Sequence, residues 1–95
     1  MKFAFLIMGD FSRETDRAVI HDGVAQIVGV KDIREACEAA GELYKNGVGC
    51  IELCGAFGED GAKEIIKATG NKIPVGYITH LPEQDEIYKM AFQGK

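Results

Sequence analysis

The sequence predicts an α/β fold, a small, open and mostly parallel four-stranded sheet with about three helices and a short edge hairpin near residues 18–28. Apolar segments of strand length alternate with amphipathic segments in the order strand, strand, helix, strand, helix, strand, helix. The first apolar segment, residues 3–8, shows no alternation, which is typical of a strand covered on both faces by helices. Two β-α-β units are therefore expected, each with a right-handed crossover.

The N-terminal third contains the first two main strands and a long loop between them. Residues 3–8 form the first strand, and residues 9–22 are polar, with charges of both signs and no helical apolar stripe. Asp22-Gly23 lies between two apolar segments, a pattern that predicts a two-residue hairpin turn. The second main strand is expected over residues 24–30.

The first helix has the clearest boundaries. Asp32 followed by Glu35 resembles a capping box, and Gly47 supplies a left-handed stop after an alanine-rich apolar stripe. The other predicted elements are a strand over 49–54, a helix over about 59–69, a strand over 74–79 and a helix over about 82–92. In the last helix, the residues expected to face inward are Ile87, Met90 and Ala91.

Length and composition restrict the class of protein. The 95 residues are enough for a single domain, spanning 1–95, and 46% hydrophobic with 27% charged residues excludes a disordered chain. Eleven basic against fifteen acidic residues give a net charge of −4, so nucleic acid and anionic membranes are poor partners. Because so small a sheet has vulnerable edges, we expect a homo-oligomer.

The sequence also predicts a cytoplasmic protein with free thiols. The apolar run at 3–8 is shorter than a secretory core, and no run approaches the ~18 residues that span a bilayer. Cys37, Cys50 and Cys54 are an odd number without a CxxC motif, which favours free cysteines in a reducing compartment.

Polar and glycine residues follow three of the predicted parallel strands. In open α/β sheets, ligands bind beyond the carboxyl ends of the strands, so these residues are the candidate site. They are Gly9, Asp10, Glu52, Cys54, Gly55, Ala56, Phe57, Gly58, Thr79 and His80. We expect Asp10, Glu52, Cys54 and His80 to gather in one hollow.

Three of these residues are candidate catalytic groups. His80 can act as an acid or base, or cap the following helix. A carboxylate within a buried strand must be paired, hydrogen-bonded or protonated. Glu52 therefore either has a role in the site or forms an ion pair, with Arg13 or Arg17 or across a subunit interface. Cys54 is a nucleophile if His80 lies about one strand spacing away, or else a small core residue.

The turn after the third strand is rich in glycine. Its GxxGxxG spacing over residues 55–61 matches no phosphate-binding motif, and the acidic Glu59 and Asp60 would repel a phosphate. A tight turn that lets backbone approach a small ligand is the better interpretation, with Phe57 as an apolar lid or a core residue. A metal set of His21, Asp22, His80 and Asp10 lacks any supporting spacing.

Two segments, IELCGAFG at 51–58 and PVGYITHLPEQ at 74–84, resemble a family of short prokaryotic proteins known as a domain of unknown function. The similarity extends over nearly the whole chain and implies no activity, cofactor or catalytic residue. From the residues alone, we expect a protein that binds a small polar metabolite at the carboxyl edge, with His80 as acid or base. The alternative is a non-catalytic ligand sensor or an oligomeric accessory protein whose polar cluster lies at a subunit interface.

Overall fold

The computed structural model of the chain describes residues 1–93 and has an α/β architecture, as predicted. Its strands are β1 (Lys2–Met8), β2 (Arg17–Ile20), β3 (Ala25–Val30), β4 (Val48–Leu53) and β5 (Val75–Tyr77). Its helices are α1 (Ile33–Lys45), α2 (Gly58–Ala68) and α3 (Asp85–Phe92), and a 3₁₀ turn (Pro82–Gln84) precedes α3. The order of the elements along the chain is that expected from the apolar pattern.

The sheet has five strands in the order β2-β3-β1-β4-β5. The four main strands that the sequence predicts, β3, β1, β4 and β5, are parallel to one another. The fifth strand is β2, which pairs antiparallel with β3 in the edge hairpin. The last hairpin pair is Ile20 with Ala25, so the turn has four residues, 21–24, rather than two. His21, Asp22 and Gly23 all have positive φ, and this left-handed run needs the longer turn.

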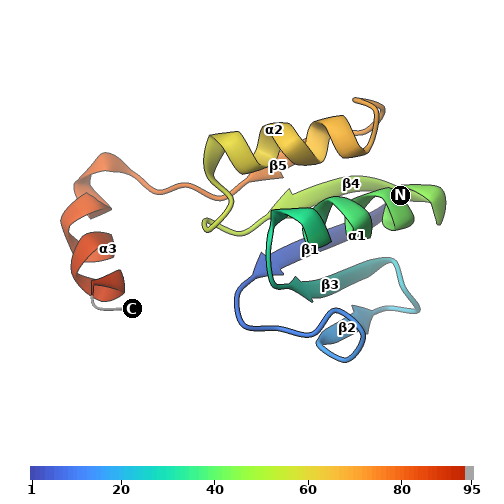
Figure 1. The fold of residues 1–95 in the computed structure, drawn as a ribbon, viewed down its shortest axis with the longest axis horizontal. Coiled ribbons are helices and arrows are strands. Elements are labelled where there is room, and N and C mark those ends of the chain that lie inside the picture. The colour runs from blue at the N-terminus through green and yellow to red at the C-terminus, as the bar shows by residue number, and fades with distance from the viewer. Residues whose placement is uncertain (94–95) are drawn as a thin grey trace.

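Both crossover helices cover the same face of the sheet, as Figure 1 shows. From β3 the chain passes through α1 to β4, and from β4 through α2 to β5, so both crossovers move across the sheet in one direction. Because right-handed crossovers in one direction place their helices on one side, the opposite face receives neither helix. The prediction that helices cover β1 on both faces is therefore wrong.

The core lies between α1, α2 and the covered face of the sheet. Leu6 and Leu53 pair across β1 and β4 and are fully buried, and Val28 beside Leu6 is 1% exposed. The helices contribute mostly small residues, such as Ala36 and Ala40, so that α1 packs closely against the strands.

The opposite face, here called the open sheet face, is largely apolar. Strand alternation places on it the side chains that lie between the core positions of each strand. They are Ala18 and Ile20 of β2, Ala25 and Ile27 of β3, Phe3, Phe5 and Ile7 of β1, and Cys50 and Glu52 of β4. Phe3 is 45% exposed and Ile20 66% exposed, so this face has aromatic and aliphatic surface in contact with solvent.

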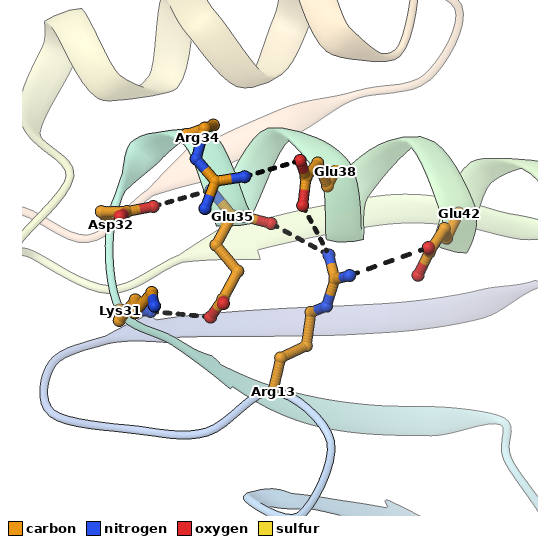
Figure 2. Close-up of polar contacts among 7 residues, drawn as sticks. All are labelled: Arg13, Lys31, Asp32, Arg34, Glu35, Glu38 and Glu42. Carbon is orange, nitrogen blue, oxygen red and sulfur yellow. Dashed lines mark hydrogen bonds and ion pairs between the residues drawn. The ribbon is translucent and has the colours of Figure 1, made fainter.

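Polar contacts fix the start of α1, as Figure 2 shows. The backbone N–H of Glu35 donates to Asp32 Oδ1 at 2.8 Å, and the backbone N–H of Lys31 donates to Glu35 Oε1 at 3.0 Å. The first bond is the N-cap contact that the capping-box pattern predicts, whereas the Glu35 carboxylate accepts from Lys31, the residue before the N-cap, rather than from Asp32 itself.

The long loop after β1 is tied to α1 by one arginine. Arg13 Nη1 donates to the backbone carbonyl of Glu35 at 3.3 Å, and the guanidinium lies 3.6 Å from Glu38 and 3.9 Å from Glu42 (Figure 2). The Arg13 side chain is 20% exposed. These contacts occupy Arg13 at α1, so it does not supply the predicted ion pair with Glu52.

The last helix does not pack on the sheet. None of its residues is buried, and Ile87 and Met90 are 58% and 70% exposed, so the prediction that they face inward is wrong. In Figure 1, α3 stands apart from the strands, on the side to which the arrowheads of β1, β3 and β4 point. The physical reason is that α1 and α2 already fill the helix-covered face, and residues 78–84 lead the chain past the sheet edge.

The N-cap of α1 provides a direct test of this local analysis. Replacing Asp32 with Ala leaves the Glu35 N–H without its acceptor, and we expect a loss of about 1 kcal/mol in the free energy of unfolding. Asp32→Asn keeps a capping oxygen and should change that free energy by only a few tenths of a kcal/mol. Urea denaturation measures both. An equal effect of the two substitutions would mean that the cap does not set the start of α1.

Candidate functional site

A pocket lies at the carboxyl edge of β4 and β5, between the sheet and α3. It has a volume of about 600 Å³, which is within the usual range for small-molecule sites. Its walls come from the end of β1, the β4–α2 turn, the end of β5 and one side of α3. The lining residues are Met8, Cys54, Gly55, Ala56, Gly58, Tyr77, Ile78, Thr79, His80, Tyr88 and Phe92.

The glycine-rich turn gives the pocket a wall of backbone. The N–H of Phe57 donates to the carbonyl of Cys54 at 3.1 Å, which closes the turn, and Gly58 then starts α2 with φ +63°. Any residue other than glycine would be strained at that φ, because its Cβ would clash with the backbone. Because Gly55 and Gly58 have no side chains, the backbone itself faces the pocket.

His80 is held by two residues of α3. Its Nε2 lies 2.7 Å from Asp85 Oδ1, and because a carboxylate only accepts, Nε2–H is the donor. The imidazole stacks on Tyr88, with ring centroids 3.9 Å apart and planes 11° apart, and Tyr88 in turn stacks on Phe92 at 6.0 Å. Three rings thus form a continuous aromatic wall.

Sequence reasoning missed Tyr88 and Phe92 as site residues. Their signal was present, since Asp85, Tyr88 and Phe92 recur at spacings of three and four and share one side of a helix. The sequence analysis instead expects Ile87, Met90 and Ala91, the other apolar stripe of this helix, to face inward.

Cys54 lies in the pocket wall but makes different contacts from those of a thiol–imidazole pair. Its Sγ accepts from the backbone N–H of Met8 at 3.3 Å, and its own N–H donates to the carbonyl of Leu6. It also packs against the core. The described side-chain contacts of His80 are with Asp85 and Tyr88, so the geometry joins Cys54 to β1 rather than to His80.

The structure separates the four residues that were expected to share one hollow. Cys54 and His80 line the pocket, whereas Asp10 is exposed in the loop after β1 and Glu52 lies on the open sheet face. Gly9 and Phe57 are also outside the lining. Gly9 is covered by the Phe11 ring, and Phe57 is a core residue at 5% exposure.

Glu52 has a different environment from the one that the sequence suggested. Its strand is not buried on both faces, so the carboxylate reaches solvent, and it receives the thiol hydrogen of Cys50 at 3.4 Å. Its Oε2 lies over Gly76, where a Cβ would come within 2.8 Å. Arg17 contacts Gln26 instead, so neither of the two predicted arginines pairs with Glu52.

The groups named as a metal set are also far apart in the fold. His21 and Asp22 lie in the turn before β3 begins, at the edge opposite to the one where His80 follows β5. Within residues 1–93, no group of three or more His, Cys, Asp and Glu side chains is placed to hold a metal ion. The three cysteines are free, as predicted.

Chemically, the pocket combines an apolar interior with a small polar end. Met8, Ile78 and the Tyr88 and Phe92 rings supply the apolar surface, while Thr79 and His80 supply hydrogen-bonding groups. This arrangement can enclose an organic molecule and orient it by a few polar contacts.

Fold and site together define a small α/β domain with a pocket at the carboxyl edge of its sheet. The chain belongs to a family of unknown function, DUF6506, whose model matches residues 1–93. The resemblance inferred from the sequence to a domain of unknown function is thereby confirmed. Comparisons with curated proteins and with solved structures find no match.

One further property follows from the described helices. Across residues 1–93, none of them combines the length and the apolar character needed to cross a membrane. The cytoplasmic location stays a prediction.

The Cys50–Glu52 contact has a measurable consequence. Burial raises the pKa of the Cys50 thiol, and the hydrogen bond and negative charge of Glu52 raise it further. We expect Glu52→Gln to lower this pKa, so that alkylation of Cys50 by iodoacetamide accelerates at a lower pH, as measured by peptide mass spectrometry. Glu59→Gln, at an exposed carboxylate paired with Lys63, is the matched control.

The same shift sets the sign of a pH effect on stability. The pKa of Cys50 is raised in the folded state. The contribution of the protonated thiol to the free energy of unfolding is therefore complete below the ordinary thiol pKa, about 8.5, and is lost as pH rises through the pKa of the folded state. An alkylation profile of Cys50 that does not move in Glu52→Gln would show that Glu52 does not influence the thiol.

Proposed function

We propose that this protein binds a small organic molecule in the pocket between the β4–α2 turn, the end of β5 and α3. The observation that carries the proposal is the pocket itself, with a volume of about 600 Å³ and a lining that converges from four elements. Its aromatic and aliphatic lining supports a ligand with an apolar ring, because burying apolar surface in such a lining is favourable.

The polar end of the pocket favours a ligand that also donates a hydrogen bond. With Nε2–H directed at Asp85, neutral His80 has Nδ1 left as an acceptor. Thr79 adds a hydroxyl, and the glycine-rich turn adds backbone groups. The ligand supported best is therefore a ring compound with a polar substituent, which is less polar than the small metabolite expected from the sequence.

Acid–base chemistry at His80 is the second candidate, and the Asp85 contact favours it. A carboxylate that accepts from one ring nitrogen orients the imidazole, so Nδ1 is left as the group that can take a proton from a bound molecule. Cys54 is not assigned a nucleophilic role in this proposal, because its sulfur already accepts from Met8.

A thermal-shift screen with monocyclic aromatic and heteroaromatic alcohols, amines and acids tests the binding proposal. Binding to the folded state raises the melting temperature, because it stabilises that state by an amount that grows with the logarithm of 1 + [L]/Kd. For a compound that stabilises the protein, we expect His80→Ala to weaken binding about tenfold or more, measured by titration calorimetry.

Two matched controls come from the same chain. His21→Ala removes the other histidine, which lies in the hairpin turn, and should leave binding unchanged. Tyr88→Ala should weaken binding, whereas Tyr44→Ala, on α1 and 37% exposed, should not. If no compound in the screen stabilises the protein, or if all four variants bind alike, the pocket is not a ligand site.

A further inference from the structure

Two apolar surfaces of the chain are left exposed within the described residues. The first is the part of the open sheet face that Phe11, which lies over Gly9 and Gly29, does not cover; it contains Phe3 and Phe5, with the 66% exposed Ile20 at its β2 edge. The second, here called the α3 ridge, consists of Ile87, Met90 and Ala91. Contiguous exposed apolar surface of this kind marks an interaction site more often than a free surface.

The α3 ridge cannot cover the open sheet face of its own chain while α3 keeps its contacts at the pocket. Asp85, Tyr88 and Phe92 occupy the pocket side of α3, through the hydrogen bond and stacking with His80 and the Tyr88–Phe92 stack. Ile87, Met90 and Ala91 lie on the other side of the same helix, since residues three and four apart share a side. The ridge therefore lies on the side of α3 away from the pocket, and α3 itself stands apart from the strands (Figure 1).

We propose that the α3 ridge of one copy packs on the open sheet face of a second copy, in a reciprocal two-fold dimer. A two-fold axis requires each chain to contribute the same pair of complementary surfaces, and this chain has both. Both crossover helices lie on one face of the sheet, so the other face lacks a covering layer. The α3 helix of the second copy would supply that layer.

The available area reaches the lower limit for a specific interface. The exposed side chains on the two surfaces, Phe3, Ile20, Ile87 and Met90, are between 45% and 70% exposed, and the half-buried Phe5, Ile7 and Ile27 lie among them. At about 100 Å² for each of the four half-exposed large apolar side chains, and less for the three half-buried ones, the two surfaces offer on the order of 500 Å² per copy, which gives the ~1,000 Å² in total that a specific interface needs.

Charge is compatible with this packing. Ile20, Ala25 and Phe3 form an uncharged row across β2, β3 and β1, whereas the Glu52 carboxylate lies in the next row, beside Phe5. The ridge can therefore cover the Ile20–Ala25–Phe3 row while the Glu52 carboxylate stays at its border, in contact with solvent.

Sedimentation equilibrium of the whole chain tests the proposal through matched substitutions. The wild type should dimerise, and Ile20→Glu on the sheet face or Met90→Glu on the ridge should each weaken dimerisation by about 30-fold or more. Val19→Glu is the control for the first, because Val19 is 64% exposed and points to the other side of β2. Circular dichroism verifies that each variant is folded.

A mixing experiment separates a helix-on-sheet dimer from other arrangements. Chains with Met90→Glu keep an intact sheet face, and chains with Ile20→Glu keep an intact ridge, so an equimolar mixture should form heterodimers with one good contact. A sheet-on-sheet dimer would survive Met90→Glu, and a ridge-on-ridge dimer would survive Ile20→Glu. Either result, or a wild type that is monomeric at ~100 μM, overturns the proposal. Ligand binding is measured separately, so failure here leaves the pocket proposal unaffected.

Discussion

The handedness of two crossovers determines most of this structure. Both β-α-β units pass across the sheet in the same direction, and right-handed connections then place α1 and α2 on one face. The core forms there, around Leu6, Leu53 and Val28, and the helices supply alanines that bring them close to the strands. Neither crossover helix covers the other face, and Phe11 of the loop after β1 lies over it at Gly9 and Gly29. A largely uncovered apolar sheet face is the direct result.

The candidate site depends on the same arrangement. Parallel strands end at one edge, and the turn after β4 and the segment after β5 meet there. The turn contributes backbone, because glycines at 55 and 58 keep side chains out of the way. The segment after β5 contributes His80 and then returns as α3, whose aromatic side closes the pocket. One face of α3 therefore serves the pocket, and the opposite face is free for a different role.

The sequence and the structure differ where burial was inferred from apolar composition. The uninterrupted apolar sequence of β1 predicts a strand that helices cover on both faces. In the structure, Phe3, Phe5 and Ile7 lie on the open sheet face. The same composition made Glu52 look like a carboxylate inside a buried strand, whereas it reaches solvent and contacts Cys50. In α3, the Ile87–Met90–Ala91 stripe was assigned to the core because it was the stronger apolar pattern, and the aromatic side that lines the pocket was overlooked.

By itself, the sequence determined the elements and their order, the capped start of α1, the edge hairpin, the free cysteines and the family. These depend on local patterns, namely apolar periodicity, caps and turn residues, which act over a few positions of the chain. Only the tertiary structure decided which face of the sheet is covered, that Cys54 and His80 line one pocket without Glu52 or Asp10, and where α3 lies. These depend on how distant segments pack against one another, and residues such as Tyr88 and Glu52 acquire their surroundings from that packing rather than from their neighbours in the chain.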